Sequence, residues 1–201
     1  MKYFNSLPKV VYTDKNNNTK TVYTNLMARA SVVPSVLNNA LVYYDYDIQD
    51  EDTPEIVAHK YYGDVGRFWI VLYCNELLNP QWDWPLSSRK FEQYVLNKYE
   101  GSLDNTHHYE KITTKTSRLT NTRTVEVDNI SEEDYNNTLY ESNNTYTIGS
   151  DIIDINVVTK IVTNYEFEIR ENDAKRNIKI LNRDYANRLE KEFMTLMGSN
   201  G

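Results

Sequence analysis

The chain has 201 residues, of which 40% are hydrophobic, so it is long enough for one or two domains with a buried core. Its formal net charge of −7 argues against general binding to nucleic acid, because the phosphates would repel it. A single cysteine, Cys74, excludes an intrachain disulfide and suits a reducing cytoplasm. No secretory signal or membrane-spanning run is present, so we expect a soluble protein without membrane association.

Tyrosine is abundant, with 17 residues. Its ring is large and apolar and its tip is polar, so it serves in cores and at protein interfaces alike. The same Tyr and Asn content also arises from an AT-rich genome, and composition alone does not separate these explanations.

The first region, residues 1–42, begins with a predicted hairpin. Two β-prone runs, Val10–Tyr12 and Thr21–Tyr23, flank a polar stretch at 14–18. The segment 26–41 is ambiguous: Pro34 interrupts it and Ser35 is a candidate start for a short helix.

The second region, residues 43–101, has the clearest boundaries. Tyr44, Tyr46 and Ile48 alternate with polar residues, which predicts a half-buried strand. A helix follows, with Asp52 or Thr53 as its cap, Pro54 in its first turn and Gly63 as its stop.

Two more helices are predicted in this region. The first runs over 64–76, because apolar residues recur there at three- and four-residue spacing and Asn75 is suited to its end. Pro80 then prevents continuation, and 81–85 is an aromatic loop or short strand. A third helix starts near Ser87 or Ser88 and ends at Gly101.

The third region, residues 102–170, is rich in Thr, Val, Ile and Tyr and is predicted to be a β-rich insert. Candidate strands cover 109–116, 123–127, 145–148 and 155–169, and the last is long enough to form an extended arm.

The fourth region, residues 171–201, contains a predicted strand at 175–181 and an amphipathic helix at 183–197 capped by Asn182. The apolar stripe of this helix either docks onto a partner or completes the chain's own core. Its members are Tyr185, Leu189, Phe193 and Leu196.

No catalytic, cofactor-binding or metal-binding set emerges from the residues. His107 and His108 are adjacent, so we expect them on opposite faces of a strand. His59 has no second His or Cys at the spacing that a metal site requires. Cys74 lies in an apolar helix, which indicates a structural thiol. The carboxylates at 45–52 fit the solvated edge of a strand and helix start, although paired carboxylates also serve glycoside hydrolysis. We therefore expect no enzyme.

The second region resembles a LysM module in its order of strand, capped helix, turn, helix and Asn. The resemblance implies an α+β fold with a βααβ module, whose second strand would lie near Trp84-Pro85-Leu86. The residues expected to define its core and turns are Tyr46, Ile48, Thr53, Pro54, Ile56, Ala58, Tyr62, Gly63, Trp69, Leu72, Asn75, Trp84 and Pro85.

The wider arrangement is similar to the baseplate wedge protein of contractile-tailed, T-even-like bacteriophages, the product of gene fifty-three. The similarity rests on Pro8 and Tyr12 before the module and on residues 83–86 and 91–99 after it. It also rests on the closing strand at 175–181 and the helix that follows. The resemblance covers about the first 100 residues and the last 30 and leaves 102–170 unmatched.

The wedge-protein resemblance implies a structural role without enzymatic activity, in a tail baseplate assembled in the host cytoplasm. The implied partners are the large wedge dimer, a sheath-initiator-type protein and hub or tube proteins. Six copies, or a multiple of six, would surround the tail.

A LysM-like module also allows a different function, binding of peptidoglycan or N-acetylglucosamine. The candidate groove residues are Asp52, Thr53, Asn75 and Asn79, with Trp82 and Trp84 nearby to stack on sugar or fill the core. The mid-chain position, single copy and lack of a secretion signal favour the wedge protein. A glycan-cleaving enzyme is a third and weaker alternative.

Overall fold

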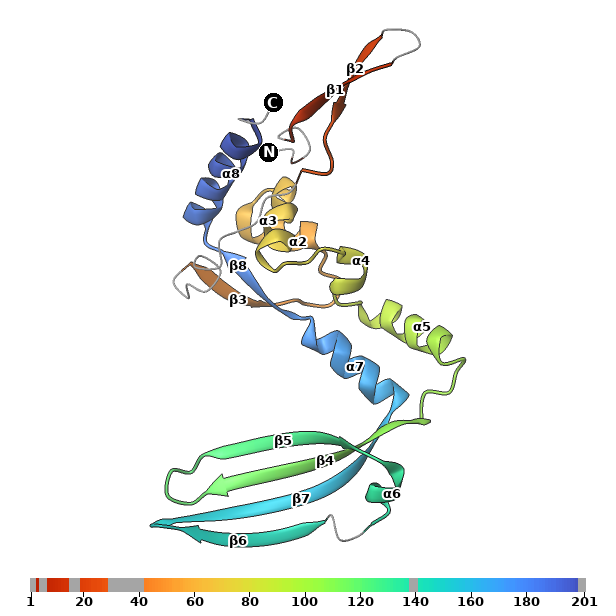
Figure 1. Cartoon of the computed structure of the whole chain (residues 1–201), viewed down its shortest axis with the longest axis vertical. Coiled ribbons are helices and arrows are strands. Elements are labelled where there is room, and N and C mark those ends of the chain that lie inside the picture. The colour runs from red at the N-terminus through yellow and green to blue at the C-terminus, as the bar shows by residue number, and fades with distance from the viewer. Residues whose placement is uncertain (1–2, 4–6, 15–18, 29–41, 138–140, 199–201) are drawn as a thin grey trace. The chain divides into compact units, whose positions relative to one another are not determined.

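The computed structural model describes residues 3, 7–14, 19–28, 42–137 and 141–198, and it is mixed α+β, as predicted (Figure 1). The chain divides into two compact units. The first combines Met1–Ser88 with Asp173–Gly201, and the second is Arg89–Asn172. The C-terminal segment therefore belongs to the same unit as the N-terminal one.

The predicted N-terminal hairpin is confirmed. Strands β1 (Lys9–Thr13) and β2 (Lys20–Thr24) pair antiparallel, from Lys9 opposite Thr24 to Thr13 opposite Lys20. The middle of the polar loop, 15–18, and the segment 29–41 with Pro34 and Ser35 lie outside the described residues.

The second sheet of the first unit joins distant parts of the sequence. Strand β3 (Tyr43–Asp47) pairs antiparallel with β8 (Asn177–Leu181), with Tyr43 opposite Leu181. The expected second strand near 84–86 is wrong, because no strand forms there. Instead, the buried Trp84 donates its Nε1–H to the Asp52 carbonyl at 2.8 Å, which holds this segment as a loop. The LysM-like arrangement stays a prediction.

The helix predicted after Thr53 is confirmed as α2 (Pro54–Tyr62). The Thr53 hydroxyl accepts the Ile56 N–H at 3.3 Å, and Gly63 ends the helix at φ 75°, a left-handed conformation that glycine adopts without strain. The predicted 64–76 helix is shorter: a 3₁₀ turn, η2 (Val65–Arg67), precedes α3 (Phe68–Cys74). The Asp64 side chain accepts the Gly66 N–H, which starts that turn. Helix α4 (Pro80–Asp83) occupies the predicted aromatic loop.

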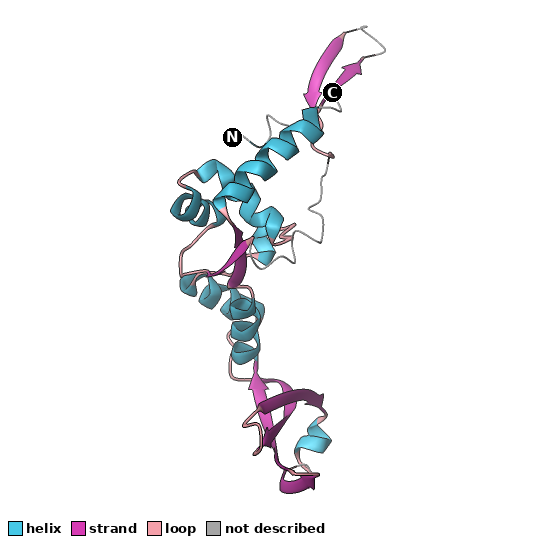
Figure 2. Ribbon diagram, turned by 90° about the vertical axis from the view of Figure 1, so that its left-hand side faces the viewer, coloured by secondary structure: helices cyan, strands magenta, loops and turns pink. Residues whose placement is uncertain are grey.

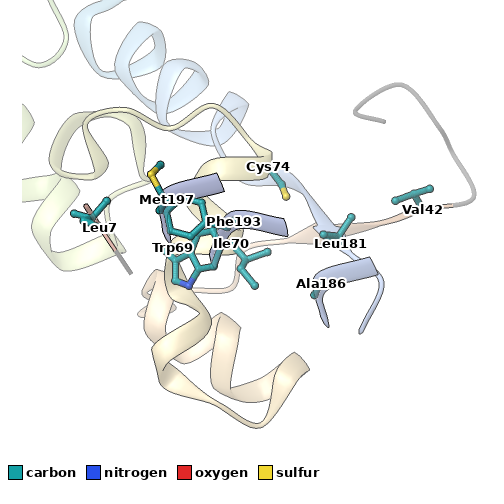
Figure 3. Close-up of a cluster of buried hydrophobic side chains, with 9 residues drawn as sticks. All are labelled: Leu7, Val42, Trp69, Ile70, Cys74, Leu181, Ala186, Phe193 and Met197. Carbon is teal, nitrogen blue, oxygen red and sulfur yellow. The ribbon is translucent and has the colours of Figure 1, made fainter. Parts of the chain in front are cut away.

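Two hydrophobic clusters hold the first unit together, and both include β8. One packs α3 and α8 (Arg183–Gly198) against each other through the buried set in Figure 3: Leu7, Val42, Trp69, Ile70, Cys74, Leu181, Ala186, Phe193 and Met197. The other joins α2 to the sheet and contains Ile48, Val57, Ala58, Val71, Trp84, Ile178 and Ile180. The C-terminal strand and helix thus complete the core of this unit.

The second unit contains a four-stranded antiparallel sheet in the order β5-β4-β7-β6, drawn as magenta arrows in Figure 2. Its strands are β4 (Thr106–Ser117), β5 (Arg123–Ile130), β6 (Ser142–Ile148) and β7 (Asp151–Thr163). The helices are α5 (Ser88–Lys98), which begins at the last residue of the first unit, the short α6 (Glu132–Tyr135) and α7 (Asn164–Ala174), whose last two residues belong to the first unit.

The prediction of an extended strand over 155–169 is wrong in its second half, because β7 ends at Thr163 and α7 follows. The α7 residues that are buried are Asn164, Glu168 and Asn172, spaced by four. Asn164 donates to the Ser102 carbonyl at 2.9 Å, which satisfies its buried amide. The buried stripe is polar, so a hydrophobic pattern could not indicate a helix. Among the described residues, no helix is long and apolar enough to cross a membrane.

Candidate functional site

The inner face of α8 belongs to the core of the first unit. Phe193 is only 3% exposed and contacts Trp69, with 5.0 Å between ring centroids (Figure 3). Tyr3 stacks on Phe193 at 5.3 Å, and Leu189 packs against the same cluster. Two members of the predicted docking stripe therefore bury against the chain itself.

One flank of α8, next to its buried face, keeps apolar side chains in solvent. Tyr185 is 39% and Leu196 57% exposed there, and Met194, on the other flank of the helix, is also exposed. Leu196 lines a shallow, open hollow together with Lys191, Glu192 and Thr195. The predicted stripe thus divides into the buried Phe193 with the half-buried Leu189, and the exposed Tyr185 and Leu196, whose side chains reach solvent.

Asp52 lies at the centre of a hydrogen-bond network in the first unit. Its carboxylate accepts the Tyr46 hydroxyl at 2.7 Å, the Lys60 ammonium at 2.6 Å and the Gln49 N–H at 3.2 Å. Burial alone raises the pKa of Asp52, but the hydrogen bonds from Lys60, Tyr46 and Gln49 outweigh burial and lower it. The network ties the end of β3 to α2.

Asn75 connects α3 to β8. Its Oδ1 accepts the Lys179 N–H and its Nδ2 donates to the Lys179 carbonyl, both at 2.8 Å. The same Nδ2 donates to the Val71 carbonyl at 2.8 Å. This side chain therefore acts like one more strand residue at the edge of β8.

The residues of the predicted glycan groove are engaged within the protein. Asp52 and Asn75 use their polar atoms in the two networks above, and Thr53 caps α2. At Asn79 the backbone N–H donates to the Asp83 carboxylate at 2.8 Å. Trp82 is exposed, whereas Trp84 is buried and bonded to Asp52. No observation on the described residues favours the glycan-binding alternative.

The residues expected to define the core take three kinds of position. Ile56 is 41% exposed and lies on the outer side of α2, which corrects its expected place in the core; Val57, one position on, is buried instead. Thr53 and Gly63 are exposed because they form the two caps of α2. Buried positions are Ile48, Ala58, Trp69, Trp84 and Pro85, and half-buried ones are Tyr46, Pro54, Tyr62, Leu72 and Asn75.

Cys74 is buried at the end of α3, and burial raises the pKa of its thiol to about 11. The thiolate that nucleophilic catalysis requires is therefore scarce at neutral pH. The environment is that of a structural thiol in the cluster with Ile70 and Leu181.

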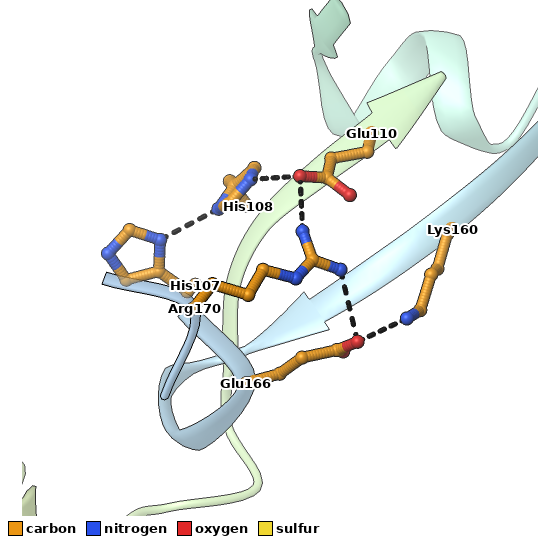
Figure 4. A network of polar contacts seen from close by, with 6 residues as sticks. All are labelled: His107, His108, Glu110, Lys160, Glu166 and Arg170. Carbon is orange, nitrogen blue, oxygen red and sulfur yellow. Dashed lines mark hydrogen bonds and ion pairs between the residues drawn. The ribbon is translucent and has the colours of Figure 1, made fainter. Parts of the chain in front are cut away.

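An ion-pair network links β4, β7 and α7 in the second unit (Figure 4). The Arg170 guanidinium bridges Glu110 at 2.7 Å and Glu166 at 3.0 Å, and Glu166 also pairs with Lys160. Burial raises the pKa of Glu110, but hydrogen bonds from Arg170 and His108 outweigh it and lower the pKa. The two carboxylates are neutralised by cations, an arrangement that holds the helix onto the sheet.

The two adjacent histidines join this network. His107 stacks on Phe167 with ring centroids 4.0 Å apart, and its Nδ1 lies 2.8 Å from Nδ1 of His108. His108 Nε2 is 3.2 Å from Glu110. Among the described residues, no three His, Cys, Asp or Glu side chains are placed to hold a metal ion.

Two features were missed at the level of sequence. The polar stripe of α7 gives no hydrophobic signal, although the four-residue spacing of Asn164, Glu168 and Asn172 was available. The pairing of β3 with β8 joins residues too distant for any local pattern to reveal.

The fold and its surfaces define a class of protein. Polar networks serve to hold segments together, while apolar side chains remain exposed on α8 and on the hairpin β1–β2. Exposed apolar surface of this kind is typical of subunits of larger protein assemblies.

The family comparison identifies the assembly. The family model described as base plate wedge protein 53 matches residues 3–196, so the chain belongs to this phage family. The match includes both compact units and also the 102–170 region, for which the sequence had indicated no relationship. The chain is thus a structural component of the virion's tail base plate. A search of curated proteins found no match.

Proposed function

We propose that this chain joins base plate wedge subunits to one another and to the hub during assembly of the base plate, without catalysis. The observation that carries the proposal is the family match over residues 3–196. The expected neighbours are the large wedge dimer, a sheath-initiator-type subunit and hub or tube proteins. Six copies, or a multiple of six, would fit the symmetry of such a ring.

The exposed flank of α8 supports this role. Tyr185 and Leu196 are exposed along one flank of the helix, next to the buried face on which Phe193 and Met197 fix it in the core. A helix held rigidly by its buried face presents the adjoining flank at a low entropic cost for binding. We therefore propose that Tyr185 and Leu196 contact a neighbouring base plate protein.

The test is co-purification with the wedge and hub proteins of the same phage. The wild-type chain should elute with wedge proteins in size exclusion, and a Tyr185→Ser/Leu196→Ser variant should show at least about tenfold weaker association. Leu78→Ser is the matched control, because Leu78 is also exposed and apolar in the same unit but belongs to the segment between α3 and α4 and not to α8. Saturable binding to chitin oligomers in calorimetry, with no complex with wedge proteins, would contradict the proposal.

A further inference from the structure

Among the described residues, none buries the strands of hairpin β1–β2. All ten residues of the two strands are exposed, and the five large apolar ones are exposed by 49% to 61%: Val10, Val11, Tyr12, Val22 and Tyr23. Because a lone two-stranded hairpin is only marginally stable in water, one that keeps this much apolar surface is expected to gain stability from a partner.

Both outer edges of the hairpin lack a paired strand in the described part of the chain, since its sheet has two strands. The backbone hydrogen bonds between the two strands fix which residues direct their N–H and C=O groups outward. The Asp14 N–H donates to Thr19 at 3.0 Å and the Asn25 N–H to Pro8 at 2.7 Å. Because antiparallel pairs alternate, Val11 and Val22 turn their backbone N–H and C=O groups away from each other.

The charge of the hairpin is opposite to that of the whole protein. Its strands carry Lys9 and Lys20 and no carboxylate, whereas the chain has a net charge of −7. Lys9 lies two residues from Val11 in β1, so the two side chains are on the same face of the hairpin. Lys20 and Val22 are related in the same way in β2. Each outward-facing backbone edge is therefore flanked by a lysine and a valine.

We propose that hairpin β1–β2 docks by strand addition onto the edge strand of another base plate protein, one that carries acidic and apolar side chains. Backbone hydrogen bonds to one outer edge supply affinity, and the lysines and the exposed Val and Tyr side chains select the strand. The inference rests on the proposed joining role and adds to it the chemistry of one contact.

Backbone-directed variants test this mode in the full-length chain. Val11→Pro and Val22→Pro each delete one outward N–H and no hydrogen bond within the hairpin, a position that proline tolerates. Val11→Thr and Val22→Thr are the matched controls, because they keep the N–H and the β-branched shape. Circular dichroism and thermal unfolding of each variant verify that the first unit remains folded.

The assay is incorporation into base plates reconstituted from the wedge and hub proteins of the same phage. One of the two proline variants should incorporate about tenfold less well, while both threonine variants stay within about twofold of wild type. Residue-resolved hydrogen exchange gives a second readout. The outward amides of one strand, at 9, 11 and 13 or at 20, 22 and 24, should become protected on assembly.

These experiments distinguish a failure of strand addition from a failure of the joining role. Both proline variants incorporating like wild type, with outward amides that exchange as in the free chain, would overturn strand addition and leave the joining role intact. Wild type failing to incorporate would overturn the joining role itself. Proline-sensitive self-association, or binding to anionic phospholipid vesicles in place of incorporation, would show that the occupant is a second copy or a lipid surface and would overturn the proposed partner.

Discussion

The side chain of Asn75 pairs with both backbone groups of Lys179, 104 residues further along the chain, through two hydrogen bonds of 2.8 Å. This contact joins the end of α3 to β8, so the C-terminal segment is held in the first unit by more than apolar packing. Both polar atoms of the Asn75 side chain are thereby engaged within the protein.

Asn75→Ala should lower the free energy of unfolding of the first unit by about 1–3 kcal/mol, because it leaves backbone groups at the edge of β8 without partners. Chemical denaturation measures the change. Lys179→Ala keeps the backbone that Asn75 contacts and alters only an exposed side chain, so it should stay within about 0.5 kcal/mol of wild type. Equal losses for both variants would contradict the assigned contact.

Trp69→Ala should lower the free energy of unfolding by about 3–5 kcal/mol, because the ring is buried between Tyr3, Tyr73 and Phe193. The midpoint of thermal unfolding of the full-length chain measures the loss of stability. Leu78→Ala serves as control, since that side chain is 85% exposed. An unchanged midpoint for the Trp69 variant would place the indole outside the core.

The stability of the first unit should fall in acid, in part through Asp52. Folding lowers its pKa from the ordinary value of 3.8, so its contribution is present above that pH and is lost as the pH falls through the folded-state pKa. Asp52→Asn should cost about 1.5–3 kcal/mol at pH 7 and progressively less below about pH 4. Unfolding curves over pH 2–7 measure this; an Asp52→Asn cost that does not change with pH would refute it.

Cys74 should be unreactive toward a disulfide reagent in the native protein at pH 8, because its thiol is buried and its pKa is raised to about 11. The same reagent should label it fully in denaturant. Rapid labelling of the native chain would instead show that α3 is accessible near its end.

Local signals in the sequence predicted much of the fold. The Thr53-Pro54 start and the Gly63 stop fix α2, because capping and left-handed geometry depend on neighbouring residues alone. The β-prone runs Val10–Tyr12 and Thr21–Tyr23, with a polar stretch between them, likewise predicted β1 and β2. Pairing between distant segments is decided by the whole core, so no local pattern indicated that β3 pairs with β8, and the LysM resemblance implied a second strand near 84–86 instead.

The candidate site was predicted less completely, for a related reason. The spacing of Tyr185, Leu189, Phe193 and Leu196 shows one helix stripe, but only the position of Trp69 and Tyr3 decides which members are buried. In the same way, the apolar residues of the hairpin indicate strands without indicating that both faces are exposed. Surfaces available to partners are what remains after the core has formed, and the core is a non-local property.

The joining role is tested most directly by base plate assembly in a phage whose copy of this gene is interrupted. Electron microscopy of the infected cell lysate should show separate wedges and no closed base plates, and supplying the wild-type chain in trans should restore them. Closed base plates of normal composition formed without the chain would contradict its role as the subunit that joins the wedges.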